Sequence, residues 1–222
     1  MKKHFLSITL LTLCVVIAAS CVKDRSITSS TVVPPPVNTG SDTLIYYWNF
    51  NTDTLHYLIP NVALVTGSSL TYSGAYSDTA QPGTTLNAVG VDTVLNLVDG
   101  SLRLRNPAGT GTFVMSLPTT GYKNIVLKYA VERTSKGSQQ NSIAYTTDGS
   151  TWITTAISAY DSYTIDSTST TNGFQLETLD FSSDSAVNNN ANFAVQVSFS
   201  NGNTNTSGND RYDNITLYGI KK

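Results

Sequence analysis

The chain is poor in the residues on which enzyme chemistry most often rests. Its 222 residues include two cysteines, two histidines and two glutamates, and 13% of all residues are charged. His4 and Cys14 lie close to the amino terminus, which leaves His56 as the one histidine further along. A zinc site built from several histidines is therefore excluded. No nucleophile motif lies beside His56, so we interpret it as a solvated or core-edge histidine.

The two glutamates, Glu132 and Glu177, lie on separate predicted strands. Hydrolysis of a glycosidic bond uses a pair of carboxyl groups that flank the bond. The chain shows no paired-carboxylate strand motif, and Ser-His-Asp chemistry would have to use His56. We therefore predict a protein that is not an enzyme and has no catalytic residues. A polysaccharide-degrading hydrolase or lyase is the third-ranked alternative.

Positive charge is also scarce. The formal net charge is −2 at neutral pH, and serine, threonine, asparagine and glycine are abundant in place of charged residues. Nucleic-acid-binding proteins carry a basic patch or stripe, and the sequence has none. We expect no nucleic-acid partner.

The amino terminus has the layout of a secretory signal. Met1–His4 is basic, Phe5–Ile17 is apolar, and the small residues Ala18–Ser20 precede Cys21. The apolar run is shorter than the about 20 residues that cross a bilayer as a helix. We therefore predict that the run is part of a cleaved signal.

This segment resembles a bacterial lipoprotein signal, in which a small residue precedes the cysteine that becomes lipidated. The resemblance implies a signal peptide over residues 1–20, a lipidated Cys21, and a membrane partner through that anchor. The implied location is the outer membrane, exposed at the cell surface or facing the periplasm. An ordinary signal followed by an incidental cysteine is the alternative. Without the signal the chain has 11 basic and 15 acidic residues, a formal charge of −4.

Residues 21–43 are rich in serine, threonine, valine and proline, with Pro34-Pro35-Pro36 near the centre. The segment has no apolar periodicity with which to bury itself, and proline favours an extended chain. We predict a tether between the lipidated cysteine and a single domain over residues 44–222.

Within that domain, apolar residues alternate with polar ones along most segments. Residues 125–131, 193–199 and 215–217 are each apolar at every second position, which is typical of antiparallel strands with one buried face. Asp148-Gly149 predicts a two-residue hairpin between residues 143–146 and 151–154. The sequence therefore predicts an all-β, two-sheet antiparallel β-sandwich with little helix.

Several segments follow one another in an order that resembles a known family. They are Trp48-Asn49-Phe50-Asn51, Tyr122–Leu127, the Asp148-Gly149 turn before Trp152, Asn192–Val195 and Asn209–Ile215. Together they resemble the jelly-roll domain of secreted and lipid-anchored proteins of Bacteroidota, over nearly all of residues 44–220. The resemblance implies a β-sandwich of jelly-roll type, similar to carbohydrate-binding modules. Members of the family differ in what they do.

Four tyrosines fall in turn-rich segments, and they are Tyr72, Tyr76, Tyr160 and Tyr163. A tyrosine ring offers a flat apolar face for a sugar ring, with a hydroxyl at its rim. We therefore predict a polysaccharide ligand at these residues and a non-catalytic glycan-binding or recognition module. One alternative is that the rings only hold loops against the sandwich. Another is a structural envelope or adhesion protein without a small ligand.

The family resemblance also implies a structural calcium ion between the first and last strands, because such domains often hold one there. Calcium prefers hard oxygen ligands, and the implied set is Asn51, Asp53, Asp210 and Asp213. The alternative for Asp213 is an ion pair with Arg211 or a turn cap.

A second resemblance concerns modification. An aspartate, then serine or threonine, then an aliphatic residue, alanine, methionine or threonine resembles the O-glycosylation acceptor pattern of Bacteroidota. The pattern occurs at Thr43, Thr54, Thr79, Thr93, Ser167 and Ser185. Loop chemistry is the alternative explanation, because aspartate, serine and threonine all favour turns.

Overall fold

The computed structural model of the chain describes residues 41–51, 58–76, 82–90, 92–93, 100–105, 111–154, 162–164, 173–200 and 208–222. These residues belong to one compact unit, Asn38–Lys222. Among them, no helix is long and apolar enough to cross a membrane. The predicted signal, residues 21–40 of the predicted tether with Cys21, and His56 lie outside the described residues. Thr43, the last residue of the predicted tether, already begins the first strand.

The described elements are strands, one 3-10 turn, η1 (Ser185–Val187), and a short helical stretch at residues 92–93. The strands are β1 (Thr43–Trp48), β2 (Val62–Ala63), β3 (Ser69–Tyr72), β4 (Ala75–Tyr76), β5 (Leu102–Arg105), β6 (Thr112–Ser116), β7 (Tyr122–Arg133), β8 (Gln140–Thr146), β9 (Ser162–Thr164), β10 (Gln175–Asp180), β11 (Ala194–Ser200) and β12 (Asn209–Lys221).

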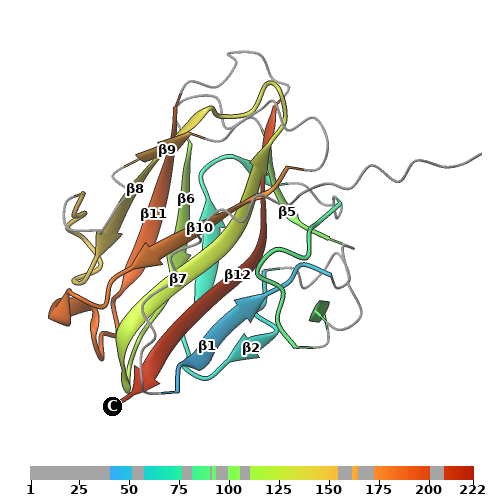
Figure 1. The fold of residues 1–222 in the computed structure, drawn as a ribbon. Coiled ribbons are helices and arrows are strands. Elements are labelled where there is room, and N and C mark those ends of the chain that lie inside the picture. Colours follow the sequence, from blue (N-terminus) through green and yellow to red (C-terminus); the bar gives the residue numbers. More distant parts are fainter. Residues whose placement is uncertain are drawn as a thin grey trace, which may run out of the picture. The chain divides into compact units, whose positions relative to one another are not determined.

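The strands form two antiparallel sheets (Figure 1). The seven-stranded sheet has the order β10-β7-β12-β1-β2, with β5 also paired to β12 and β4 paired to β5; the five-stranded sheet has the order β3-β6-β11-β8-β9. The chain changes sheet at each step from β5 to β8 and again from β10 to β12. This alternation makes the fold a two-sheet antiparallel β-sandwich of jelly-roll type, as the sequence predicts.

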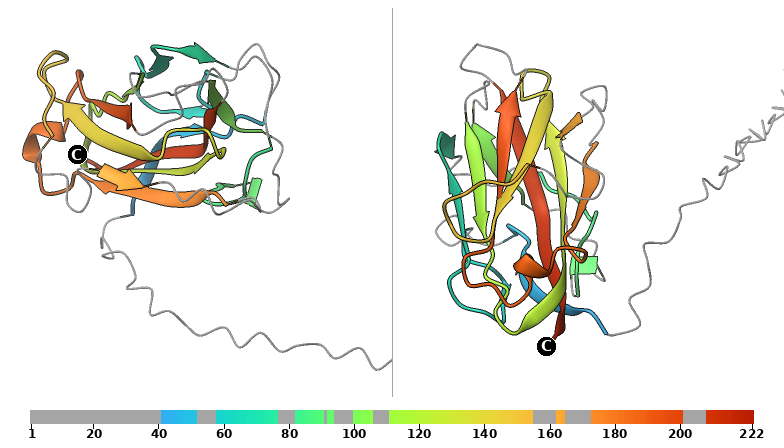
Figure 2. Two further views of the ribbon diagram at one scale, coloured as in Figure 1. Left: turned by 90° about the horizontal axis from the view of Figure 1, so that it is seen from above. Right: turned by 90° about the vertical axis from the view of Figure 1, so that its left-hand side faces the viewer.

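The core lies between the two sheets, which Figure 2 shows as two layers. The predicted apolar positions supply it, because Ile125, Leu127 and Val195 are fully buried. Contacts also bridge the sheets: the rings of Phe113 on β6 and Tyr212 on β12 have centroids 4.9 Å apart. Burial of these alternating side chains on one face of each sheet is what the period of two predicts.

The last strand, β12, lies at the centre of the seven-stranded sheet (Figure 1). One edge of β12 pairs with β7, and the other edge pairs first with β5 and then with β1. Its register against β7 shifts between Asp213 and Thr216, where Asn214 has a φ of 48°. Asparagine is among the few residues that tolerate this left-handed conformation.

On one face of β12, residues that the sequence pattern predicts to be exposed are buried. Thr216 occupies an outward position between the core residues Ile215 and Leu217, yet all three are buried. Residues 82–90 lie over this outer face: Asn87 Nδ2 donates hydrogen bonds to Asn214 O at 2.6 Å and to Thr216 Oγ1 at 2.9 Å. A segment distant in sequence therefore buries positions whose local pattern predicts exposure.

The hairpin at Asp148-Gly149 is longer than predicted. Backbone hydrogen bonds close it between Tyr145 and Ile153, at 3.0 and 2.7 Å, so the two-residue loop is wrong. The carboxylate of Asp148 accepts hydrogen bonds from the backbone N–H groups of Ser150 at 2.8 Å and Thr151 at 2.7 Å. Gly149 takes a positive φ of 80°, and the Asp148 carboxylate organises the longer turn around it.

Candidate functional site

A row of side chains crosses the outer face of the seven-stranded sheet at one end. Arg211 on β12 lies directly opposite Glu132 on β7 and Arg103 on β5. Phe174 comes one residue before Gln175, which pairs with Val131, so Phe174 continues the row beyond Glu132. Residues directly opposite in antiparallel strands share a face of the sheet, and these four therefore lie side by side.

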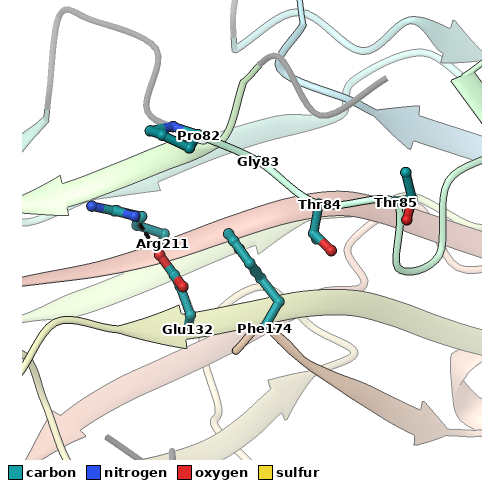
Figure 3. Close-up of a pocket in the computed structure, with 7 residues that line it drawn as sticks. All are labelled: Pro82, Gly83, Thr84, Thr85, Glu132, Phe174 and Arg211. Carbon is teal, nitrogen blue, oxygen red and sulfur yellow. Dashed lines mark hydrogen bonds and ion pairs between the residues drawn. The ribbon is translucent and has the colours of Figure 1, made fainter. Parts of the chain in front are cut away.

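A pocket of about 200 Å³ opens over this row. Its walls come from two parts of the chain: Phe174, Glu132 and Arg211 from the sheet, and residues 82–85 from the covering segment. Figure 3 shows Arg211 and Glu132 joined across the pocket, with Phe174 beside them and residues 82–85 passing over β12. The lining thus combines an aromatic ring, a guanidinium, a carboxylate and two threonines.

Arg211 and Glu132 form an ion pair, with Nη1 of the arginine 2.5 Å from Oε1 of the glutamate. Their side chains are 22% and 11% exposed, so the pair is only partly screened by water. The sequence left open an ion pair between Arg211 and Asp213. In the structure Arg211 pairs with Glu132 instead.

A buried polar cluster lies on the same face, where β1, β12, residues 82–90 and Asp92 meet. The Tyr47 hydroxyl lies 2.9 Å from Asp92 Oδ2 and 2.7 Å from Asn214 Oδ1. Asn49 Nδ2 donates a hydrogen bond to Asp92 Oδ2 at 2.7 Å. The Asp213 carboxylate accepts hydrogen bonds from the backbone N–H groups of its neighbour Asn214 and of Thr84, both at 2.7 Å.

Burial, with a smaller effect of the nearby Asp92 carboxyl, raises the pKa of Asp213 to about 8, against the lowering effects of the Thr84 and Asn214 N–H groups. Neither Asp92 nor Asp213 has a cationic partner among the described residues, where the one salt bridge joins Arg211 and Glu132. Asn51 reaches the same region, because its Oδ1 accepts a hydrogen bond from Gly100 N at 3.0 Å. The cluster is therefore an oxygen-rich site with two buried acids, which fits the ligand preference of calcium.

The calcium ligand set expected from the sequence is not brought together as a group. Asp210 shares a strand face with the core residue Tyr212, whereas Asp213 lies on the opposite face. Three residues along a strand also separate the two by about 10 Å, too far for one ion. Asp53 lies outside the described residues, and Asp92 was not foreseen. Within the described part, no three His, Cys, Asp or Glu side chains form a metal-binding group.

Asp210 has an environment of its own. It is fully buried, Oδ1 accepts a hydrogen bond from Ser138 N at 2.9 Å, and Oδ2 has no hydrogen-bond partner among the described residues. Desolvation raises the pKa of Asp210 well above its usual value, against smaller lowering effects of the Ser138 N–H, the Arg133 charge and Asn141.

The structure places three of the four candidate tyrosines on strands and describes the side chain of one. Tyr72 on β3 is 8% exposed, its ring packs edge-on against Phe199, and its hydroxyl donates to Arg105 O at 3.1 Å. This ring therefore packs in the core. For Tyr72 the structure thus favours the alternative in which the ring holds the chain against the sandwich. The side chains of Tyr76 on β4 and Tyr163 on β9, and the whole of Tyr160, lie outside the described residues.

The two glutamates point to different faces of the seven-stranded sheet. Glu177 on β10 lies opposite the core residue Tyr129 and is 5% exposed, while Glu132 lines the outer pocket. Burial raises the pKa of Glu177. Glu132 and Glu177 therefore do not flank a common site as a pair of catalytic carboxylates would.

Three of the six predicted O-glycosylation acceptors fall in the described part. Thr43 begins β1, Thr93 is exposed with its hydroxyl donating to Ala88 O at 2.7 Å, and Ser185 is exposed in η1. Thr54, Thr79 and Ser167 lie outside it.

Sequence reasoning missed most of the pocket. Phe174, Pro82, Thr84 and Thr85 carry no motif, and Arg211 and Glu132 are 79 residues apart. The available signal was weak: an Arg211 two residues before the Asp213-Asn214 pair, and a Glu132 on the outward phase of its strand. Only pairing of their strands makes them neighbours.

These observations define the class of the protein as an all-β sandwich of jelly-roll type with a small polar pocket on one outer sheet face. No protein-family model matches the chain, and no curated protein matches it. Solved structures similar to it include a family 29 carbohydrate-binding module at 12% identity, covering 82% of this chain and 90% of that one with a TM-score of 0.45.

Another is a family 29 carbohydrate-binding module from Piromyces equi at 12% identity, covering 82% of this chain and 93% of that one with a TM-score of 0.39. A third is a xylan-binding module of family 15 at 16% identity, covering 72% of this chain and 95% of that one with a TM-score of 0.35. The likeness is one of fold.

Proposed function

We propose that this chain is a non-catalytic glycan-binding module and that its pocket at Glu132, Phe174 and Arg211 receives one sugar residue. The observation that carries the proposal is the lining of that pocket. Phe174 supplies an apolar ring for the carbon face of a sugar. Arg211 donates hydrogen bonds and Glu132 accepts them, and the hydroxyl of Thr85 does either.

The size of the pocket supports a single sugar residue rather than a long stretch of polymer. At about 200 Å³ it is smaller than the roughly 300–1,000 Å³ of typical ligand sites. A shallow polar pocket of this kind binds weakly, because stacking and a few hydrogen bonds must offset the loss of translational freedom. Tyr76, Tyr160 and Tyr163 remain candidates to extend the binding surface along a chain.

A glycan array with the full chain in detergent tests this function. We expect binding to at least one polysaccharide, loss of binding in Phe174→Ala, and little change in Leu176→Ala. Leu176 is a matched control because it is exposed on β10, two residues from Phe174, and does not line the pocket. Absence of any glycan hit would instead favour a structural envelope or adhesion protein.

We also propose that Cys21 anchors the chain in the outer membrane as a lipoprotein. The order of basic, apolar and small residues before Cys21 supports this. Labelling cells with a radioactive fatty acid should mark the wild-type chain and Cys14→Ala, and leave Cys21→Ala unlabelled and uncleaved. Equal label in both variants would refute the anchor.

A calcium ion at the buried polar cluster is a further proposal, with Asp92, Asp213 and Asn51 as the residues that would hold it. Bound there, calcium would supply the positive charge that the two buried acids lack. Chelation with EDTA should lower the melting temperature of the full chain, and added Ca²⁺ should restore it. An unchanged melting temperature after chelation would exclude the ion.

For the O-glycosylation proposal, the exposed acceptors Thr93 and Ser185 are the best placed of those described. Mass spectrometry of tryptic and chymotryptic peptides from the native host should find added hexose mass at one or both. Unmodified peptides at both positions would leave turn formation as the role of these residues.

A further inference from the structure

We infer that the sugar held in this pocket is acidic, with a carboxylate that Arg211 binds. The inference rests on the proposed function, and it specifies the class of glycan. Its starting point is Arg211, the one basic residue among those that line the pocket. Arg211 lies beside Glu132, the one acidic residue of the lining.

The hydrogen bonds of Arg211 support this assignment. Its guanidinium has five N–H donors, and its one hydrogen bond within the described residues runs from Nη1 to Glu132 Oε1. The Nε atom is buried and has no hydrogen-bond partner among those residues. The Arg211 side chain is 22% exposed, so guanidinium donors that Glu132 does not use remain available to an acceptor on the ligand.

A carboxylate is the acceptor that suits this geometry. It is planar and offers two oxygens that match the fork of a guanidinium. In a uronic acid the carboxylate is attached to the sugar ring, so the ring can contact Phe174 while the carboxylate contacts Arg211. Figure 3 shows Arg211, Glu132 and Phe174 on the same side of the sheet, which allows both contacts at once.

Glu132 has a different role for an acidic sugar than for a neutral one. It competes with a ligand carboxylate for Arg211 and repels its negative charge. For a neutral sugar, Glu132 would be a useful acceptor for hydroxyl groups. Removing its charge therefore has opposite effects on the two ligand classes.

The experiment measures binding of the full chain to polygalacturonate and alginate, to the same polymers after reduction of their carboxyl groups, and to a sulfated polysaccharide, dextran sulfate. We expect the uronate polymers to bind and their reduced forms to bind about tenfold more weakly, because a charge-assisted hydrogen bond is lost. Binding should weaken as salt rises. Arg211→Gln should lose about tenfold, and Glu132→Gln should bind the uronate polymers more tightly.

Lys123→Gln is the control for a change in total charge. Lys123 is exposed on β7, nine residues from Glu132 and therefore about 30 Å along the strand. Its removal should leave binding unchanged. A thermal melt of each variant separates loss of binding from loss of fold, and Glu132→Gln keeps the test valid if Arg211→Gln fails to fold.

Equal binding of native and carboxyl-reduced polymers, weaker binding in Glu132→Gln, or binding to dextran sulfate alone would each overturn the acidic-sugar inference. Binding to neutral polysaccharides alone would overturn it as well, and would leave the glycan-binding function standing. Failure to bind any neutral, uronate or sulfated polymer would overturn both.

Discussion

Asn214 is the residue at which the first strand, the last strand and the covering segment meet. Its Nδ2 donates hydrogen bonds to Thr84 O at 2.7 Å and Leu86 O at 3.0 Å, and its Oδ1 lies 2.7 Å from the Tyr47 hydroxyl. It does so at a left-handed φ of 48°, which an asparagine adopts more easily than most residues. One side chain thus ties residues 82–90 to the sheet.

We predict that Asn214→Ala destabilises the domain by about 2–4 kcal/mol, from lost buried hydrogen bonds and a strained φ. Asn124→Ala is the matched control, because Asn124 also has a positive φ of 54°. Its side chain makes no hydrogen bond within the described part. That control should cost about 1 kcal/mol. Chemical denaturation measures both, and equal losses would contradict the role assigned to the Asn214 amide.

Asp210 predicts a pH dependence of stability. Burial raises its pKa in the folded state, so the folded protein keeps a proton that the unfolded chain releases above about pH 4. Stability that depends on this group is present at low pH and falls as pH rises towards the folded-state pKa.

We predict that Asp210→Asn reduces this loss and melts higher than the wild type at pH 8, because the amide needs no proton to stay neutral. At pH 4 the two proteins should differ little. Asp213 is present in both, so the difference between their melting curves reports on Asp210. A lower melting temperature for the variant at every pH would show that the Asp210 carboxylate is charged and stabilising.

At the scale of elements, the close approach of residues 82–90 to the sheet depends on Gly83. A Cβ atom there would lie 2.1 Å from Gly100 O and 2.5 Å from Asp213 Oδ2, far inside contact distance. The covering segment therefore needs glycine at this position.

We predict that Gly83→Ala displaces the segment, lowers stability by about 1–3 kcal/mol and weakens glycan binding, since the segment forms one wall of the pocket. Thr85→Ala, an exposed change in the same segment, should leave the melting temperature within about 1 °C of wild type. A Gly83→Ala chain that melts like wild type would show that the segment adjusts without cost.

The alternation of β11 makes a second prediction at this scale. Val195 is fully buried, whereas its neighbour Gln196 is half-buried on the other face. Val195→Asp should unfold the domain because it places an unpaired charge in the core. Gln196→Asp should change stability by less than about 1 kcal/mol. Circular dichroism and thermal melts distinguish the two, and similar behaviour of both variants would contradict the assigned faces.

At the scale of the whole molecule, the pairing of the chain's last strand with its first has a consequence for folding. Because β12 separates β7 from β1 and β5, the seven-stranded sheet cannot close until the last residues are available. Contacts so far apart in sequence also favour slow folding.

We predict that a chain ending at Gly208, and therefore lacking β12, is unfolded and rapidly digested by proteases. A chain that lacks only Lys222 should melt within a few degrees of the full chain, because Lys222 contributes one backbone hydrogen bond, to Gly121 O at 2.8 Å. Limited proteolysis with circular dichroism measures both. A stable β structure in the shorter chain would contradict the central role of β12.

The core was predictable because the signal for it is local. Over residues 125–131 of β7 and 195–199 of β11, the core residues are apolar and lie two residues apart, so the pattern alone assigns the face that packs in the core. The pocket was not predictable, because Thr84, Glu132, Phe174 and Arg211 come from four separate parts of the chain. Tyr72 looked like a loop residue for the same reason, because its burial against Phe199 depends on two strands that meet only in the fold.

By itself the sequence determined the class of fold, since periodicity of two, turn residues and the lack of helical stripes act over a few residues at a time. The tertiary structure alone decided three further features. They are the pairing of Arg211 with Glu132, the burial of Asp213 beside Asp92, and the placement of Asp210 on the face of β12 opposite to Asp213. The physical reason is that strand register and the covering segment set the environment of these charged groups, and neither is encoded in the residues next to them.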